Sequence, residues 1–312
     1  MRLVTFRLGS SPPRTGALIE GDRRVLDLEA AYGRVYHGAS PLLETMLHII
    51  EAGEASLDTI GQLLKAPAAS VTFGREEIQL LAPVPVPPQM RDFLCFEQHL
   101  KQAFAAVAKL RGAEARIPQV WYERPIFYHP NRFSVCGTDT DVPWPTYTER
   151  LDYELEFGCY IAKRGKDIAR EQAREYIFGY TIFNDFSARD EQAKEMAGQL
   201  GPGKGKDFDN GNAMGPCIVT ADELGDPYRL EMIARVNGEE WGRGNSRDMH
   251  WKFEDCIAHA SRSETLHPGE FFGSGTVGNG CGLEQLRFLK PGDLVELEVE
   301  RIGVLRNRVV RG

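Results

Sequence analysis

The sequence contains no long hydrophobic run. No window approaches the ~18 consecutive apolar residues that a membrane-spanning helix needs, and the N-terminal MRLVTFRLGSS lacks the apolar core of a secretory signal peptide. We therefore expect a cytoplasmic protein with no membrane partner.

An excess of positive charge is also missing. The chain has 37 Lys and Arg residues against 45 Asp and Glu residues, which gives a net charge of −8. Because nucleic-acid binding usually needs a basic face, we expect no nucleic-acid partner. A negative total still leaves room for a local basic pocket that binds a small anion.

Paired cysteines are absent from the sequence. The six cysteines, at 95, 136, 159, 217, 256 and 281, are scattered and form no C-x-x-C motif. In a chain of this length such cysteines are more often reduced core residues than a disulfide framework. No cysteine or histidine pair has the spacing of a zinc site.

The patterns that are present suggest two unequal domains. Residues 1–40 resemble short strands, and residues 41–65 carry apolar residues at helical spacing. Prolines at 83, 85, 87 and 88 suit an extended connector. We predict a small N-terminal β domain with a helix at 1–80 and a catalytic domain at 81–312.

The larger predicted domain is mainly β, within an α+β fold class. Its strongest hairpin signal is Asn237-Gly238. We expect one helix over 95–111, closed by Gly112, and another over 166–180 with Asp167 as its N-cap.

The segment LDYELEFGCYIA, residues 151–162, resembles a strand that carries a row of acids. Glu154 and Glu156 point to the same face, ~7 Å apart along the strand, where two unscreened carboxylates repel. A solvated strand face is the simple explanation. The apolar residues that alternate with the acids instead indicate a strand packed in a sheet.

Further acids occur in two other polar segments. Asp185 and Asp190 follow the apolar YTIF, and Asp92 lies in RDFLCFEQH. Hard oxygen ligands from separate elements suit Mg²⁺, Mn²⁺ or Ca²⁺ better than zinc. A bound dication removes the repulsion that makes such a row of carboxylates costly.

Four motifs together resemble the fumarylacetoacetate hydrolase family. They are DYELE (152–156), GYTIFNDFSARDEQ (179–192), GKGKDFDNGNAMGP (203–216) and GSGTVG (273–278). The resemblance extends from about residue 80 to the end of the chain. It implies a mixed β-sandwich roll preceded by a small β domain, and a homodimer.

The resemblance implies a divalent-metal site and a general base. Its metal ligands correspond to Glu154, Glu156 and Asp185, and Asp92 is a fourth candidate because it lies seven residues before the catalytic His99. A general base needs a partner that fixes its tautomer. Glu284 of GCGLE matches that partner, and Glu97 is the alternative. Gln102 stands where shorter family members have the glutamate.

The resemblance also implies a set of substrate contacts. Arg189, Gln192 and Lys206 match positions that bind carboxylate or carbonyl oxygens, with Lys204 as a competitor for the role of Lys206. Thr276 and Tyr128 match further substrate-side positions. We expect Asp190 to pair structurally with a neighbour.

The chemistry that this set implies is hydrolysis of a C–C bond in a small anionic 1,3-diketone of the acylpyruvate type. His99 activates water, and Lys206, Arg189 and Gln192 help the metal to hold the enolate that leaves. The same enolate chemistry supports decarboxylation of oxaloacetate-like acids and isomerisation or hydration of 2-oxo-dienoates, so a metal-dependent 2-oxo acid decarboxylase or isomerase is the alternative. A non-catalytic binding homologue is the alternative of another class, and the loss of the family's Asn-Tyr pair before His99 is what keeps it open.

Overall fold

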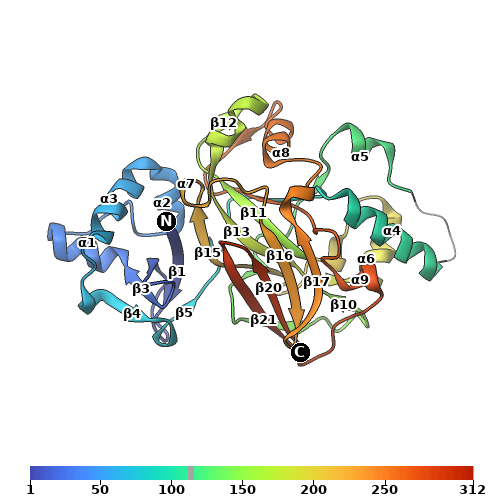
Figure 1. Ribbon diagram of the computed structural model, residues 1–312, viewed down its shortest axis with the longest axis horizontal. Coiled ribbons are helices and arrows are strands. Elements are labelled where there is room, and N and C mark those ends of the chain that lie inside the picture. Colours follow the sequence, from blue (N-terminus) through green and yellow to red (C-terminus); the bar gives the residue numbers. More distant parts are fainter. Residues whose placement is uncertain (112–115, 312) are drawn as a thin grey trace.

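The computed structural model describes residues 1–111 and 116–311. The chain folds around two large β-sheets, with helices at both ends of the molecule (Figure 1). This arrangement confirms the predicted α+β class with a large share of strands. Within the described ranges, no helix has the length and apolar character that a membrane span requires.

The larger sheet runs through most of the molecule. Its main path, in spatial order, is β4 (Thr72–Gly74), β3 (Arg24–Asp27), β2 (Arg14–Ile19), β1 (Arg2–Arg7), β15 (Asn212–Thr220), β13 (Ile177–Asp185), β11 (Leu155–Ile161), β19 (Phe271–Gly273), β6 (Met90–Phe93) and β7 (Phe127–Tyr128). Two short strands, β5 (Gln79–Leu80) and β8 (Val135–Cys136), pair with β1 and β15 off this path. Most neighbours are antiparallel, but β6 runs parallel to β19.

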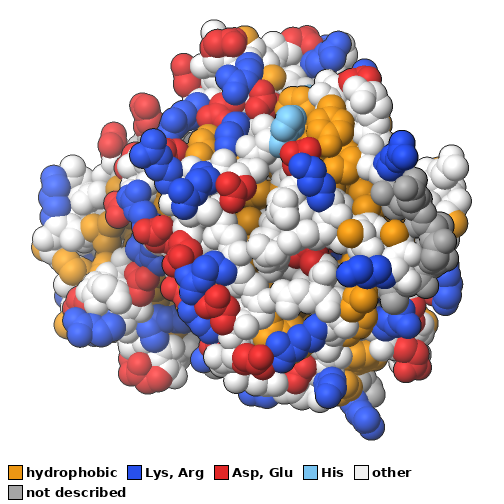
Figure 2. Space-filling model, turned by 45° about the vertical axis from the view of Figure 1, so that its right-hand side comes forward, with side chains coloured by type: hydrophobic (Ala, Val, Ile, Leu, Met, Phe, Trp, Pro, Cys, Tyr) orange, Lys and Arg blue, Asp and Glu red, His pale blue; other side chains and the backbone are white. Residues whose placement is uncertain are grey.

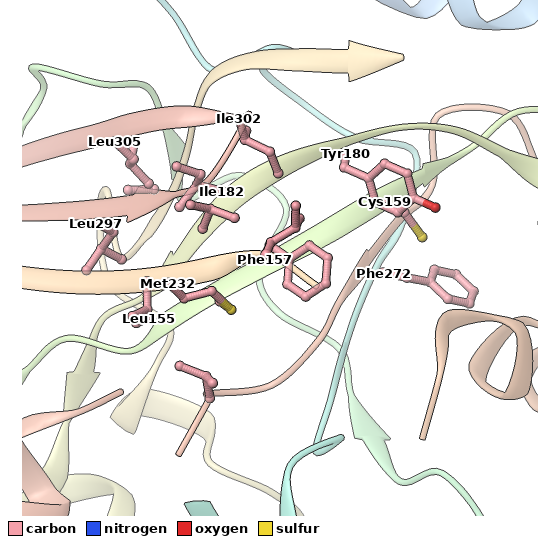
Figure 3. Close-up of a cluster of buried hydrophobic side chains, with 14 of the residues drawn as sticks. Leu155, Phe157, Cys159, Tyr180, Ile182, Met232, Phe272, Leu297, Ile302 and Leu305 are labelled. Carbon is pink, nitrogen blue, oxygen red and sulfur yellow. The ribbon is translucent and has the colours of Figure 1, made fainter. Parts of the chain in front are cut away.

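The second sheet packs against the central strands of the first. Its order is β17 (Glu239–Asn245), β16 (Glu231–Val236), β20 (Leu294–Val299), β21 (Gly303–Arg311) and β9 (Asp141–Trp144). The predicted hairpin between β16 and β17 is confirmed, with positive φ angles of 53° at Asn237 and 79° at Gly238. Leu155 and Phe157 of β11 meet Met232 of β16 and Leu297 of β20 in the apolar layer between the sheets (Figure 3).

The N-terminal segment joins the larger sheet directly. β1 pairs with β15, with Leu3 opposite Ile218. Three helices, α1 (Leu28–Tyr36), α2 (Met46–Ala52) and α3 (Glu54–Leu64), contribute to a core that also contains Ile218 and Tyr160. Residues 1–80 thus share a sheet and a core with the rest of the chain, and a domain boundary near residue 80 stays a prediction.

The spacing of apolar residues predicted where helices form, but it did not predict where one helix ends and the next begins. Residues 41–65 contain two helices, because Gly53 interrupts the run with a φ angle of 55°. α4 (Glu97–Arg111) matches the predicted helix, while Gly112, its expected closing residue, lies outside the described residues. α4 and the short α5 (Gln119–Glu123) lie at the opposite end of the molecule from the N-terminal helices (Figure 1).

The predicted helix over 166–180 is wrong. The structure has a 3-10 helix at Arg170–Tyr176, followed by β13. Asp167 does not cap it, because its φ angle is 50° and its carboxylate accepts from the backbone N–H of Ser263 at 2.7 Å. Packing against α8 (Phe253–Ala260), which a local pattern does not encode, selects the tighter helix.

The remaining elements are short. They are β10 (Leu151–Asp152), β12 (Gly165–Lys166), β14 (Ser187–Ala188), α6 (Arg189–Glu195), α7 (Ala221–Leu224), β18 (Thr265–Leu266), α9 (Gly282–Gln285) and further 3-10 turns at Ala69–Val71, Arg75–Glu77, Met196–Gly198, Gly203–Gly205 and Ser246–Asp248. On the face shown in Figure 2, acidic and basic side chains are interspersed, and hydrophobic side chains gather toward the right of the view.

Candidate active site

The order of five neighbouring strands brings the predicted acids to one place. In the path β13-β11-β19-β6-β7, Glu156 lies opposite Phe183, two residues before Asp185. Asp92 pairs with Gly273 on one side and Tyr128 on the other. Residues distant in the sequence therefore meet where the strands end.

Three of the carboxylates form a buried cluster. Asp92, Glu156 and Asp185 each place one carboxylate oxygen within 4.8 Å of the others. Their exposed fractions are 5%, 0% and 0%. A solvated strand face is therefore excluded, and the side chains converge as the metal hypothesis requires.

Burial and mutual repulsion disturb the titration of this cluster. Burial raises the pKa of Asp185 to about 6, although Lys206 opposes the shift. Burial, followed by the neighbouring carboxylates, also raises the pKa of Glu156. Burial and then the Asp185 charge raise the pKa of Asp92 as well.

The cluster fits a divalent cation. Among the described residues, Glu156 Oε2 and Asp185 Oδ1 are buried and have no hydrogen-bond partner. Two orphaned carboxylate oxygens beside the Asp92 carboxylate form a hard oxygen donor set, which Mg²⁺, Mn²⁺ and Ca²⁺ prefer. Asp92, Glu156 and Asp185 would hold such an ion.

Glu154, one of the three ligands that the family resemblance implied, faces two cations and is not part of the cluster of Asp92, Glu156 and Asp185. Its Oε2 lies 2.5 Å from Lys206 Nζ, and its Oε1 lies 2.8 Å from an Arg189 nitrogen. Burial alone raises the pKa of this carboxyl, but Arg189 and Lys206 outweigh it and lower the value. Glu154 thus lies beside the cluster, and each of its carboxylate oxygens already contacts a cationic side chain.

The two candidate lysines occupy different environments. Lys206 is 3% exposed and donates to Glu154 and to the Asp185 carboxylate. Lys204 lies on the exposed surface and donates to the backbone oxygen of Asp207. Only Lys206 lines the site, so the geometry favours it over its competitor.

His99 pairs with Glu284 and not with Glu97. His99 Nδ1 lies 2.9 Å from Glu284 Oε1, and both side chains are buried. Glu97 instead contacts the Tyr122 hydroxyl and Lys101 near the surface. Because an ionised carboxylate only accepts, its contact assigns the proton to Nδ1 and leaves the Nε2 lone pair free to take a proton.

The remaining predicted residues surround the same space. Arg189 Nη1 donates to Gln192 Oε1 at 3.0 Å. The Tyr128 hydroxyl donates to Asp185 Oδ2 at 2.7 Å, and the Thr276 hydroxyl contacts Glu156 Oε1 at 3.3 Å. Asp190 pairs structurally as expected, accepting from Thr148 and from the Glu149 backbone.

A cavity of about 570 Å³ connects these groups. Its polar lining includes the acid cluster, His99, Arg189 and Lys206. Its other walls are largely apolar and include Ala103, Phe104, Val107, Ile126, Leu283 and Phe288. The volume is within the ~300–1,000 Å³ that ligand pockets commonly have.

Sequence reasoning did not identify the parts of the apolar wall that come from α4, Leu283 and Phe288. Ala103 and Val107 follow His99 at intervals of four residues, so the three share one face of α4. Once the helix was predicted, that spacing could have placed Ala103 and Val107 beside His99 in the site. The contributions of Leu283 and Phe288 depend on tertiary packing and have no local signal.

Comparison with known proteins identifies the family. Residues 89–310 match the family model described as fumarylacetoacetate (FAA) hydrolase C-terminal. The chain belongs to the fumarylacetoacetate hydrolase family. The resemblance drawn from the four sequence motifs, and the fold that it implied, are therefore confirmed, and the chain is an enzyme of this superfamily.

The chain resembles several family members over almost its whole length. It is 33% identical to the mitochondrial oxaloacetate tautomerase fahd2 of Xenopus laevis, covering 99% of this chain and 90% of that protein. It is 29% identical to the oxaloacetate tautomerase YisK of Bacillus subtilis, covering 94% and 95%. A crystal structure of maleylpyruvate hydrolase from Sphingobium sp. SYK-6 superimposes with a TM-score of 0.77, at 25% identity and 100% coverage of both chains.

Proposed function

We propose that this family member is a divalent-metal-dependent enzyme that interconverts the keto and enol forms of a small 2-oxo acid, with oxaloacetate as the first candidate. The full-length similarity to oxaloacetate tautomerases carries this proposal. We therefore put the isomerase alternative of the sequence interpretation ahead of the C–C hydrolase.

Enolisation needs a base at one carbon and positive charge around the oxygens. A divalent ion held by Asp92, Glu156 and Asp185 would polarise the 2-oxo and carboxylate oxygens of the substrate. Lys206 and Arg189 line the same cavity and add two donors with fixed positive charge. Gln192, held by Arg189, is placed to donate its amide to a substrate oxygen.

His99 is the proposed base. Its Nε2 takes a proton from C3 of oxaloacetate, so the C3–H bond breaks and the charge moves to the C2 oxygen. Return of the proton to that oxygen gives the enol, and return to C3 gives the keto form. Glu284 keeps Nδ1 protonated and stabilises the imidazolium between the two transfers.

The Lys206→Met variant is expected to lower kcat/KM by about 10-fold or more. A hydrogen bond to a charged group is worth about 1.5–3 kcal/mol, and each ~1.4 kcal/mol is a factor of ten. Lys204→Met is the matched control, since Lys204 lies outside the cavity. Steady-state kinetics of both variants with Mg²⁺ measure the difference, and equal values for the two would contradict the role of Lys206.

A substrate panel tests the proposed function. The protein is assayed with Mg²⁺ on oxaloacetate and on acylpyruvates with short and aromatic tails, and enol–keto exchange, CO₂ release and C–C cleavage are scored separately. Enol–keto exchange of oxaloacetate is expected to exceed the rate in Mg²⁺ buffer without protein. Cleavage of an acylpyruvate without any acceleration of that exchange would make the chain a hydrolase instead.

A further inference from the structure

Asp152 is a buried carboxylate behind the site. It is 0% exposed, lies on β10 and does not line the cavity. Its Oδ2 accepts from Arg189 Nε at 2.8 Å, and Arg189 Nη2 lies 2.8 Å from the same oxygen. Asp152 thereby holds the Nε–Nη2 edge of the Arg189 guanidinium. Glu154 Oε1 also lies 2.8 Å from Nη2, and Gln192 Oε1 accepts from Nη1.

The same carboxylate also holds the helix that carries Glu284. Asp152 Oδ1 accepts from the backbone N–H of Gly282 at 2.8 Å, and Oδ2 accepts from that of Leu283 at 2.9 Å. These are the first two residues of α9. A Cβ atom on Gly282 would come within 1.9 Å of the Arg287 backbone oxygen and 2.6 Å of Asp152 Oδ1, so both approaches require glycine.

We propose that Asp152 is a positioning residue that fixes Arg189 and the His99–Glu284 pair relative to each other. This inference rests on the proposed function of those groups. One carboxylate accepts hydrogen bonds from Arg189 and from the start of α9. It therefore fixes the distance between Arg189, which would bind the substrate, and Glu284, which orients the base. Loss of its charge or of an acceptor oxygen therefore disturbs binding and proton transfer together.

A second buried aspartate offers a matched control. Asp27 is also 0% exposed, pairs with Arg14 Nη1 at 2.7 Å and accepts from the backbone N–H of Ala30 at 3.0 Å. It has the same kinds of partner as Asp152, an arginine and the start of a helix. Its partners belong to the N-terminal segment and do not line the active-site cavity.

The first measurement compares D152N with D27N. In D152N an amide nitrogen replaces one acceptor oxygen, so Arg189 or an α9 amide loses its partner. We expect kcat to fall about 10-fold or more and KM to rise, whereas D27N lowers Tm and leaves both constants within twofold of wild type. Values of kcat and KM for D152N within twofold of wild type would overturn the proposal.

A double-mutant cycle separates positioning from general destabilisation. If Asp152 acts through Glu284, D152N should lower kcat much less in an E284Q background than in wild type, because the two changes remove one function. The same fold-loss in both backgrounds would show that Asp152 does not act through Glu284. If D152N does not fold by circular dichroism, Asp152→Ser replaces it with the same expectations.

Amide hydrogen exchange gives a readout that does not depend on the reaction. D152N should speed exchange in the peptide that contains residues 282–285, and D27N should not. Unchanged exchange in that peptide would contradict the contact between Asp152 and α9 in solution. If wild type fails to accelerate enol–keto exchange of oxaloacetate, the proposed function falls, while the exchange result still decides whether Asp152 orders α9.

Discussion

Removing divalent metal is expected to abolish turnover, and adding Mg²⁺ or Mn²⁺ to restore it. The reason is the buried convergence of Asp92, Glu156 and Asp185, whose like charges lie within 4.8 Å of one another. Without a cation, burial and the mutual repulsion of these carboxylates disfavour their charged forms and raise the pKa of all three groups. Activity before and after exhaustive treatment with EDTA measures the effect. Full activity of the metal-free protein would reject the metal assignment.

A pair of glutamate variants gives this prediction a matched control. The tripeptide Glu-Leu-Glu occurs at 154–156, at the start of β11, and again at 296–298, within β20. Glu298 lies at the surface of β20 and pairs with Arg235 at 2.6 Å. Glu156→Gln is expected to reduce Mn²⁺ affinity by at least 10-fold and turnover to below about 1% of wild type, because it removes one of the three converging ligands. Glu298→Gln should change neither, as titration calorimetry with Mn²⁺ and steady-state kinetics can establish.

Replacing His99 by alanine is expected to lower kcat by about 100-fold or more. General-base assistance typically contributes 10²–10⁴-fold, and His99 is the one base in the described part of the cavity whose tautomer is fixed by a buried carboxylate. Mn²⁺ affinity should stay unchanged, because His99 is not part of the cluster of Asp92, Glu156 and Asp185. An unchanged kcat in this variant would remove His99 from the mechanism.

The partner of His99 can be tested in the same assay. Glu284→Gln should reproduce a large part of the loss, since the neutral amide no longer stabilises the imidazolium. Glu97→Gln is the control, because Glu97 lies two residues from His99 in sequence yet contacts Tyr122 and Lys101. A larger effect from Glu97 than from Glu284 would show that the contact at 2.9 Å has no catalytic role.

The sequence motifs predicted the chemistry of the candidate site. Carboxylates at 92, 154, 156 and 185 predicted a hard dication, and the structure brings three of them together. The motif order also implied the fold that the family match confirms. The motifs did not predict that Glu154 pairs with cations, because Lys206 and Arg189 reach its carboxylate from other elements of the fold.

Some local predictions failed where tertiary contacts decided the outcome. The expected helix at 166–180 is a 3-10 turn and a strand, because the segment packs on α8 and Asp167 adopts a positive φ angle. Asp152 was visible as the first acid of DYELE, yet its bonds to Arg189 and to the start of α9 join segments 37 and 130 residues apart. The homodimer and the cytoplasmic location stay predictions.

The sequence by itself determined which side chains are available, namely hard oxygen donors, a histidine and cations spaced as in one enzyme family. The tripeptide Glu-Leu-Glu alone does not distinguish residues 154–156 from residues 296–298, and the sequence separated them only through the surrounding motif DYELE. The fold decides, because β11 lies between β13 and β19 with Glu156 fully buried, whereas Glu298 on β20 reaches Arg235 at the surface. Glu156 is a candidate metal ligand because it is buried where other carboxylates converge. Glu298 forms an ordinary ion pair because it is partly exposed to solvent.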